Sequence, residues 1–569
     1  MKRLIYLPLI IVLVSGITSS CDDITDFLEK PPGVDVTEDT IFSSKNQLET
    51  FVAGTYYWNV MSYLPYWDAR DKSDCSTDCA TDQCEVFATW FWVQWAWNSA
   101  GMTANSPGDL RFAAHWKGLR RANTIIERID DAPFNDDAYK KQVRGEARFM
   151  RAYTNFELFR KYGGIPLLKK RLAPSDDLEI PRSTVKEVVD FIIEDCNAAI
   201  ADLPAANEYP SDMRGRATSL AAMALKARTL LYAASKTFNT DKPYLSLGAN
   251  NDLICYGNYD RERWKLAADA SKAVIDEAKR TGIRLIDEYG PDANYQYVWE
   301  QNDNDEIILA EKSQDLRYDW HFPWQYLLPN QGYCVTHNFT KLYESKEGTK
   351  LPWKDEGGDD LMEIYANMDP RYKQTVTYQG QFFNNDYPKL DMSVNGLHKP
   401  KGAGCEGAFV HKPMPYSVQV TGYVPAVPNG TIFRLAEFYL NYAEALNEYA
   451  QTPPQEAYEA VRVVRARSGM PSFPQGLSQS EFRDKLRNER AIELAFEGHR
   501  LYDIRRWEMA DEGIMHGNMY GIHIYKGTGD NCSYEPYVFE VRSFKPAMYR
   551  YAFPQSEIDK GYLIQNPGY

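Results

Sequence analysis

Apolar residues recur every three or four positions over much of the chain, which is the spacing of one face of an α-helix. Between Tyr139 and Tyr162 this face consists of Val143, Ala147, Met150, Tyr153 and Phe156. The same rhythm predicts helices at 47–58, 109–129, 184–203, 218–235, 264–279, 431–449 and 454–467. Short connectors between them, and the small alanines of LAAMALKARTLLYAAS, predict helices that pack closely in pairs.

Between Thr281 and Gly430 the helical rhythm gives way to Gly, Pro, Asn and aromatic residues. This part is expected to form a loop-rich lobe with a few short strands, inserted in a helical scaffold. The run EIILAE at 306–311 predicts one such strand. No Ser-, Gly- or Pro-rich linker and no block of charge divides the chain, which favours one large unit over several domains.

The segment from 488 to 507 reads as a continuous helical run with an unusual charge pattern. Glu489, Glu493 and Glu497 recur at every fourth position, so these carboxylates share a helix face and repel one another. A structural charge network is therefore expected, with cations brought from elsewhere in the chain. The candidate cations are Arg500, Arg505, Arg506, Arg462, Arg465 and Arg467. Arg371 is likewise expected to hold structure.

The first twenty residues have the pattern of an export signal. Lys2 and Arg3 precede an apolar stretch that is too short to span a membrane, and a small, polar tail follows it. Next comes Cys21 with two aspartates, which resembles a bacterial lipobox with Cys21 as the lipidated residue, although Thr18 stands where most lipoboxes have Leu. The alternative is a secreted protein cleaved near Ser20. No other segment is apolar enough to cross a bilayer, so lipid alone is expected to anchor the chain.

The composition is acidic and rich in aromatic residues. Lys and Arg number 64 against 79 Asp and Glu, a net charge of −15, which argues against nucleic acid or anionic lipid as a partner. The hydrophobic content of 44% is ample for a core. The 39 Tyr and 13 Trp exceed what a core needs, and such a surplus is typical of sugar-binding surfaces.

One aromatic cluster places four tryptophans in eight positions, at 90, 92, 95 and 97. Sugar rings present flat C–H faces that dock on indole rings, while their hydroxyls need amide, carboxylate or guanidinium groups at the ring edge. Trp95 and Asn98 offer a stacking face and an amide together. Core packing beneath the lobe is the alternative for each ring. The candidate ligand-binding residues here are Arg70, Asp71, Trp90, Trp92, Trp95 and Asn98.

A second aromatic cluster follows the predicted strand, and Pro323 within it favours an exposed loop. Its candidate ligand-binding residues are Tyr318, Trp320 and Trp324.

Metal sites have weak support in the sequence, and no cofactor is expected. The oxygen-rich run NDNDE at 302–306 has a spacing compatible with calcium, but it lacks the Gly and distal Glu of an EF-hand loop, so a solvated turn is favoured. Cys75, Cys79 and Cys84 lie close together, and a local disulfide is expected among them in an exported protein. Zinc is the alternative, but these cysteines form no C-x-x-C pair and no His is nearby.

Several segments in the C-terminal part of the chain carry a family resemblance. NERAIELAFEGHRLYDIRRW (488–507) resembles the E-R-x-x-E-L-x-F-E-G-H-R-x-x-D-x-R-R-W block of the SusD/RagB-type nutrient-binding lipoproteins. RLAEFYLNYAEALNE (434–448), VRARSGMP (464–471), MDPRYKQT (368–375) and the final FPQSEIDKGYLIQNPGY are similar to further blocks of that family. The middle third of the chain matches only loosely, and ligand specificity is expected to lie there.

The resemblance implies a mainly α, SusD-like fold with a scaffold of tetratricopeptide-type helix pairs. A signal peptide (1–20) would precede one SusD-like domain (21–569), with its scaffold at about 40–280 and 431–510 and its lobe at about 281–430. The implied function is non-catalytic binding of oligosaccharide or polysaccharide and its delivery to a SusC-like TonB-dependent transporter. The implied location is the outer membrane, lipid-anchored and facing the cell exterior.

Two other functions are weighed against this one. The same family includes peptide binders, but a peptide site would use fewer exposed rings than the tryptophan-rich segment offers. A surface glycoside hydrolase needs two opposed carboxylates, and 79 acidic residues make such pairs uninformative. No G-x-S-x-G, H-E-x-x-H or phosphate-binding glycine loop occurs. We therefore name no catalytic residue.

Overall fold

The computed structural model describes residues 37–60, 77–86, 88–173, 175–210, 213–301, 303–311, 333–400, 403–412, 416, 430–511 and 513–569. The predicted signal peptide lies outside these residues. So do Cys21, Arg70, Asp71, Cys75, Tyr318, Trp320 and Trp324.

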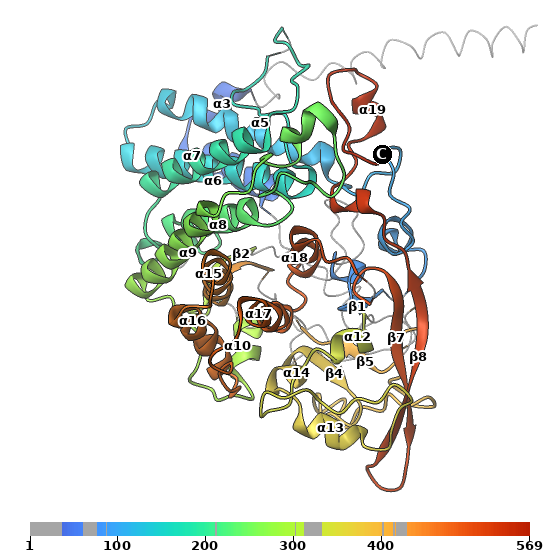
Figure 1. Ribbon diagram of the computed structural model, residues 1–569. Helices are drawn as coiled ribbons and strands as arrows, with labels where there is room; N and C mark the ends of the chain where they lie inside the picture. The colour runs from blue at the N-terminus through green and yellow to red at the C-terminus, as the bar shows by residue number, and fades with distance from the viewer. Residues whose placement is uncertain are drawn as a thin grey trace, which may run out of the picture.

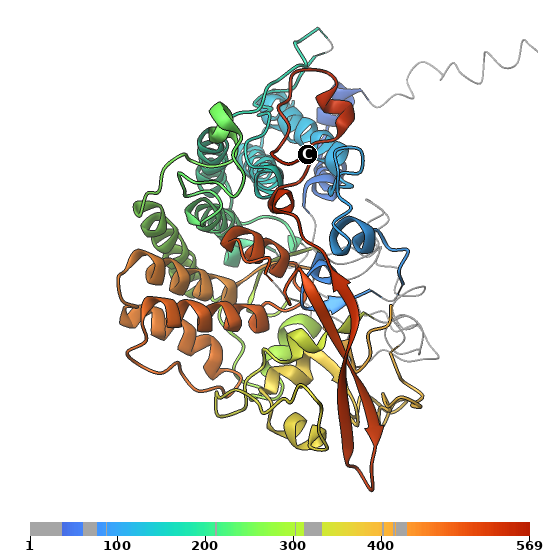
Figure 2. The ribbon, with the colours of Figure 1, turned by 45° about the vertical axis from the view of Figure 1, so that its right-hand side comes forward.

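Helices stack side by side along one flank of the molecule (Figures 1 and 2). They are α3 (Glu38–Phe42), α4 (Lys45–Asn59), α5 (Phe112–Arg128), α6 (Asp137–Tyr162), α7 (Val185–Asp202), α8 (Ser219–Ala234), α9 (Glu262–Thr281), α15 (Leu435–Tyr449), α16 (Gln455–Ala466) and α17 (Gln479–Glu493). The mainly α fold class is confirmed, and the predicted helices are present to within a few residues. One boundary is wrong: 431–434 belong to a strand, because these residues pair with another strand before the helix begins.

Local sequence explains where several of these helices begin. Thr184 and Ser478 each accept a hydrogen bond from the backbone three residues on, while Glu187 and Glu481 reach back to the capping residue. These reciprocal bonds satisfy backbone groups that a helix N-terminus otherwise leaves without partners. Both helices therefore start at positions that the sequence itself marks.

The packing order links the two halves of the scaffold. Each helix from α4 to α9 packs on the next, and α9 then packs on α15, so the chain between them leaves the stack and returns to it. The alanines of α8 are mostly buried at these contacts, as predicted. The guanidinium of Arg228 on α8 also meets the carboxylate of Glu437 on α15, with 2.5 Å between Nη2 and Oε2.

Short strands and helices fill the space beside the scaffold. β1 (Cys84–Glu85), β3 (Cys334–Val335), β5 (Ala408–Val410) and β4 (Val376–Tyr378) form one antiparallel sheet in that order. β2 (Ile307–Glu311) is the predicted strand and pairs with β6 (Gly430–Arg434). The accompanying helices are α10 (Asn294–Glu300), α12 (His337–Thr340), α13 (Leu361–Asn367), α14 (Pro370–Thr375) and α19 (Gln555–Ile558).

A long hairpin near the C-terminus was not predicted. β7 (Gly517–Lys526) and β8 (Cys532–Arg542) pair along their full length and run down the edge of the lobe (Figure 2). A signal for it is present in the sequence, because buried Ile522 and Ile524 alternate with more exposed residues before a glycine-containing turn.

The predicted continuous helix from 488 to 507 is wrong, because the backbone turns in its middle. α17 ends at Glu493, and α18 (Arg500–Trp507) begins only after a turn. In this turn Phe496 and Gly498 adopt left-handed conformations, with φ of 57° and 72°. Glu489 and Glu493 therefore lie in the last turns of α17, whereas Glu497 lies in the turn between α17 and α18.

These carboxylates form the expected charge network, and their side chains are buried. Arg371 of α14 bridges Glu489 and Glu493, with Nη1–Oε distances of 2.5 and 3.0 Å. Arg434 bridges Glu493 and Glu497, at 2.7 Å to each. The predicted structural role of Arg371 is confirmed, while Arg434 was missed.

The remaining cations come partly from the predicted set. Arg465 contacts Glu489 at 2.6 Å, and Arg467 contacts Glu493, so these two predictions are confirmed. Lys412, which was missed, contacts Glu497 at 2.5 Å. The other predicted cations have different partners: Arg462 binds Glu459 at the surface, Arg500 binds Asp82, Arg505 donates to the carbonyl of Tyr549, and Arg506 binds Asp503 and Glu444.

We expect Glu493→Gln to lower the free energy of unfolding by about 3–5 kcal/mol, because the loss of a buried carboxylate leaves cations without full compensation. The control is Glu459→Gln, which removes the exposed partner of Arg462 and should change stability by less than about 1 kcal/mol. Urea denaturation followed by circular dichroism measures both. Equal losses in the two variants would contradict the role of the network.

The network also predicts how stability depends on pH. Burial alone would raise the pKa of Glu493, but Arg467, Arg434 and Arg371 outweigh it and lower this pKa to about 2. An unfolded Glu titrates near pH ~4.3, so the stabilisation is fully present above that pH and is lost as pH falls towards 2. We expect Tm to fall between about pH 5 and 2, and to fall less steeply in Glu493→Gln. Parallel Tm profiles would contradict this assignment.

Candidate functional site

The tryptophan segment (residues 88–98) presents aromatic rings to solvent. Trp90 is 69% exposed and Trp95 is 40% exposed, while Trp92 is half-buried. Trp90 stacks on Phe91 with ring centroids 4.1 Å apart, and Trp92 meets Trp95 edge to face at 6.0 Å. Of the predicted ligand-binding residues that the structure describes, these three tryptophans are therefore the ones with surface rings.

The other side of the same segment belongs to the core. Phe91, Val93, Ala96 and Trp97 are buried, and the ring of Trp97 meets that of Tyr551 edge to face at 5.1 Å. The core-packing alternative therefore holds for Trp97 and not for Trp90 or Trp95.

A widened helical turn separates the two faces. Residues Gln94–Asn98 form a π-helical turn, η2, closed by a 2.9 Å hydrogen bond from the amide of Ser99 to the carbonyl of Gln94. π-Helical turns are rare overall, but those that occur are often found at functional sites. The chain then reverses at Ala100, which has a φ of 51°, and the amide of Gly101 donates to the carbonyl of Trp95 at 2.9 Å.

The buried carboxylate of Glu85 supports the inner side of the tryptophan segment. Glu85 on β1 accepts hydrogen bonds from the side-chain amides of Gln94 and Asn98, and it pairs with Arg542 at the end of β8. The exposed rings therefore sit on a base that joins residues far apart in the sequence.

The predicted role of Asn98 at the edge of the Trp95 ring is wrong, because Asn98 is only 2% exposed. Its amide donates inward to the carbonyl of Cys79 at 3.3 Å and to Glu85 at 3.4 Å. The three-residue spacing from Trp95 does not put the two side chains on one exposed face, since the turn between them is π-helical.

The turn predicted as a calcium candidate has arginines around its carboxylates. Asp303 faces Arg214 at 3.6 Å and Asp305 faces Arg284 at 3.1 Å. Glu306 is fully buried and contacts Arg434 and Arg467. Within the described ranges, no group of three or more His, Cys, Asp or Glu is arranged to hold a metal ion. The sequence favoured a solvated turn over calcium at this place, and the calcium alternative stays untested.

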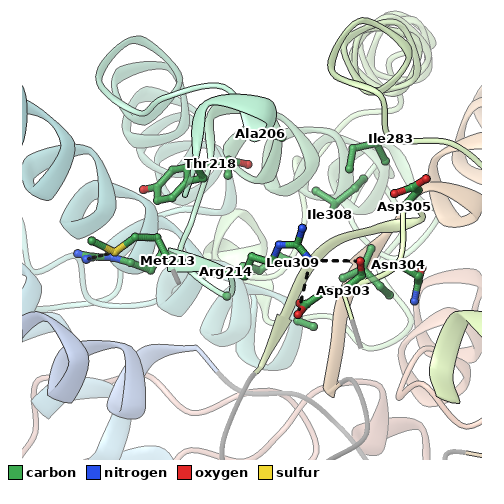
Figure 3. Close-up of a pocket in the computed structure, with 15 residues that line it drawn as sticks. Ala206, Met213, Arg214, Thr218, Ile283, Asp303, Asn304, Asp305, Ile308 and Leu309 are labelled. Carbon is green, nitrogen blue, oxygen red and sulfur yellow. Dashed lines mark hydrogen bonds and ion pairs between the residues drawn. The ribbon is translucent and has the colours of Figure 1, made fainter. Parts of the chain in front are cut away.

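A cavity of about 160 Å³ lies between β2 and the segment around 206–218. Figure 3 shows Arg214 reaching across it towards Asp303, with the side chains of β2 on one wall. A larger hollow of about 590 Å³ lies between the 279–294 region and α15–α16, with Tyr439 and Leu435 among its lining residues. Neither is lined by the tryptophan segment. The residues that line each cavity come from elements distant in sequence, so no linear motif in the sequence identifies either cavity.

None of the helices within the described residues combines the length and apolar character needed to span a membrane.

Two family models match different parts of the chain. The family described as "SusD family" matches residues 288–569, and the one described as "Starch-binding associating with outer membrane" matches residues 26–231. SusD-like protein P38 of Formosa agariphila is 24% identical over 542 residues, covering 89% of this chain and 92% of that protein.

Solved structures show the same fold. A SusD-like protein of Bacteroides fragilis is 26% identical, with a TM-score of 0.76 over 95% of this chain and 100% of that one. A laminarin-binding SusD-like protein is 20% identical, with a TM-score of 0.62 over 93% of this chain and 100% of that one.

Gly101 tests how the tryptophan segment is held. A Cβ at this position would lie 2.1 Å from the carbonyl oxygen of Trp95, so Gly101→Ala forces the segment to move. We expect a loss of about 1–3 kcal/mol in unfolding free energy and a shifted tryptophan emission spectrum. The control is Gly248→Ala, where a Cβ meets no atom within 4 Å and only the backbone strain of a φ of 65° applies. A Gly101→Ala protein with unchanged emission and stability would contradict this geometry.

Proposed function

The chain belongs to the SusD family, and on that premise we propose that it binds oligosaccharide or polysaccharide at the cell surface without chemical change. Its relatives support this choice of ligand, since one matching family is described as starch-binding and one structural relative as laminarin-binding. The family's association with the outer membrane supports the proposed location.

The observation that carries the proposal is the exposure of Trp90 and Trp95 on a rigid base. Exposed indoles from one short segment provide an apolar surface of the kind that marks interaction sites, whereas an isolated exposed ring is common on protein surfaces. Sugar rings fit this role, because their C–H faces stack on indole while their hydroxyls stay hydrated. The support from Glu85 and Arg542 keeps the rings in position before the ligand arrives, which lowers the entropic cost of binding.

We further propose that the protein is lipidated at Cys21 and passes its ligand to a SusC-like TonB-dependent transporter. Lipid attachment would hold the domain at the membrane through the residues that follow Cys21. Capture and release by stacking need no bond cleavage, so the proposal assigns no catalytic group. Peptide binding and glycoside hydrolysis are the competing outcomes.

We expect Trp90→Ala combined with Trp95→Ala to weaken glycan binding about 5- to 150-fold, because each of the two stacking contacts contributes roughly 0.5–1.5 kcal/mol. Tm should change by less than about 2 °C, since both rings are exposed. Affinity gel electrophoresis with laminarin and with amylopectin measures retention. The matched control is Tyr259→Ala, which removes a 58% exposed ring from another part of the surface.

The same gels separate the proposal from its rivals. Retention of either polysaccharide by the wild type and the Tyr259 variant, but not by the double variant, supports the proposal. Equal retention by all of them would show that these indoles are not the site. New reducing ends after incubation with polysaccharide would indicate a hydrolase, and binding of a peptide mixture alone would indicate a peptide receptor.

A further inference from the structure

Two buried thiols lie in direct contact beneath the tryptophan segment. Cys79 is in the short helix η1 (Thr77–Ala80), and Cys84 begins β1. Their Sγ atoms are 3.2 Å apart, and neither side chain is exposed. A disulfide has an S–S bond of about 2.05 Å, so a movement of about 1 Å would join them.

We propose that Cys79 and Cys84 form a disulfide while the exported chain folds. This inference rests on the proposed location outside the cytoplasm, where disulfides form and persist. Of the three cysteines at 75–84, the structure describes Cys79 and Cys84, and their Sγ contact points to this pair. Cys334 on β3 and Cys405, which precedes β5, form a second pair whose side chains hydrogen-bond to each other.

The reaction is an exchange with a disulfide-bearing thiol oxidant. One cysteine thiolate attacks the oxidant disulfide, which forms a mixed disulfide and releases one oxidant thiol. The second cysteine thiolate then attacks the sulfur of the first and expels the other oxidant thiol. The protein loses two protons and two electrons, and the oxidant disulfide is reduced to two thiols.

The structure also sets when this exchange takes place. Both thiols are enclosed in the folded protein, and burial raises the pKa of the Cys84 thiol, which leaves little of the reactive thiolate. Exchange therefore precedes the docking of residues 77–86. Once the segment has docked, the bond is shielded from reductants.

The disulfide would stabilise residues 77–86, which contact the tryptophan segment. Residues 77–86 are held by distant groups: the amide of Gly498 donates to Asp78 at 3.2 Å, and Arg500 pairs with Asp82 at 2.7 Å. Glu85, next to Cys84, receives the side-chain amides of the tryptophan segment. A covalent link between Cys79 and Cys84 would keep this short loop closed when those contacts open transiently.

Mass spectrometry after blocking tests the proposal directly. The full-length chain, exported to a bacterial periplasm, is denatured with N-ethylmaleimide without reductant and cleaved before aspartate. This cleavage separates Cys75 (peptide 74–77), Cys79 (78–81) and Cys84 (82–108). We expect 78–81 linked to 82–108, two hydrogens lighter than the sum of the peptides, and 74–77 alkylated. Alkylation of both Cys79 and Cys84, or a link from 74–77 to either, would overturn the proposal.

A second measurement compares Tm with and without reductant. It includes the wild-type protein, so the test does not depend on whether the cysteine variants fold. The wild-type Tm should be about 2–4 °C lower after unfolding and refolding in excess phosphine, which gives the reductant access to the enclosed bond, whereas the Tm of Cys79→Ala/Cys84→Ala should not respond to this reductant treatment. Cys196→Ala, which alters a buried thiol of α7, should keep the wild-type response. A wild-type Tm that ignores reductant would overturn the proposal. Neither readout involves glycan, so failure of the proposed ligand binding would be seen separately.

Discussion

The buried ion pairs around α17 are the constraint on which the arrangement of this molecule depends. Glu489, Glu493 and Glu497 have almost no solvent contact, so each requires basic partners within the protein. The partners come from separate elements: Arg371 from α14, Lys412 beyond β5, Arg434 from β6, and Arg465 and Arg467 from α16 and its end. A displacement of any of these elements would leave a charge buried without compensation. The network thereby holds the lobe against the helical scaffold.

The same part of the chain supports the surface where binding is proposed. After the turn that follows α17, Arg500 at the start of α18 pairs with Asp82, close to Glu85 and the tryptophan segment. Around the tryptophan segment, Asp82, Glu85 and Arg500 are therefore buried, whereas Trp90 and Trp95 are exposed. Carbohydrate binding by stacking benefits from this division, because the rings need to be in place before the ligand arrives.

Periodicity predicted the helices because their apolar faces repeat along the chain, and the spacing of Glu489 and Glu493 predicted a charge network. The break after Glu493 was missed, although Gly498 marks a place where a left-handed turn is favourable. Arg434 and Lys412 could not be assigned, since only the tertiary fold brings them to Glu497. At the candidate site, composition indicated exposed indoles. Trp97 was not among the candidate residues, but composition did not explain why it is buried while Trp90 and Trp95 are exposed. Nor did it show that Asn98 points towards Glu85. The orientations of Trp97 and Asn98 depend on a π-helical turn.

The central claim is that indole faces at the surface of this rigid segment hold carbohydrate. A crystal structure of the protein with an oligosaccharide of whichever glycan it retains would test that claim most directly. The account predicts a sugar ring stacked on Trp90 or Trp95, with the contacts of Glu85 to Gln94, Asn98 and Arg542 unchanged. A sugar bound elsewhere, for instance in the hollow of about 590 Å³ beside Tyr439, with both indoles uncovered, would contradict it.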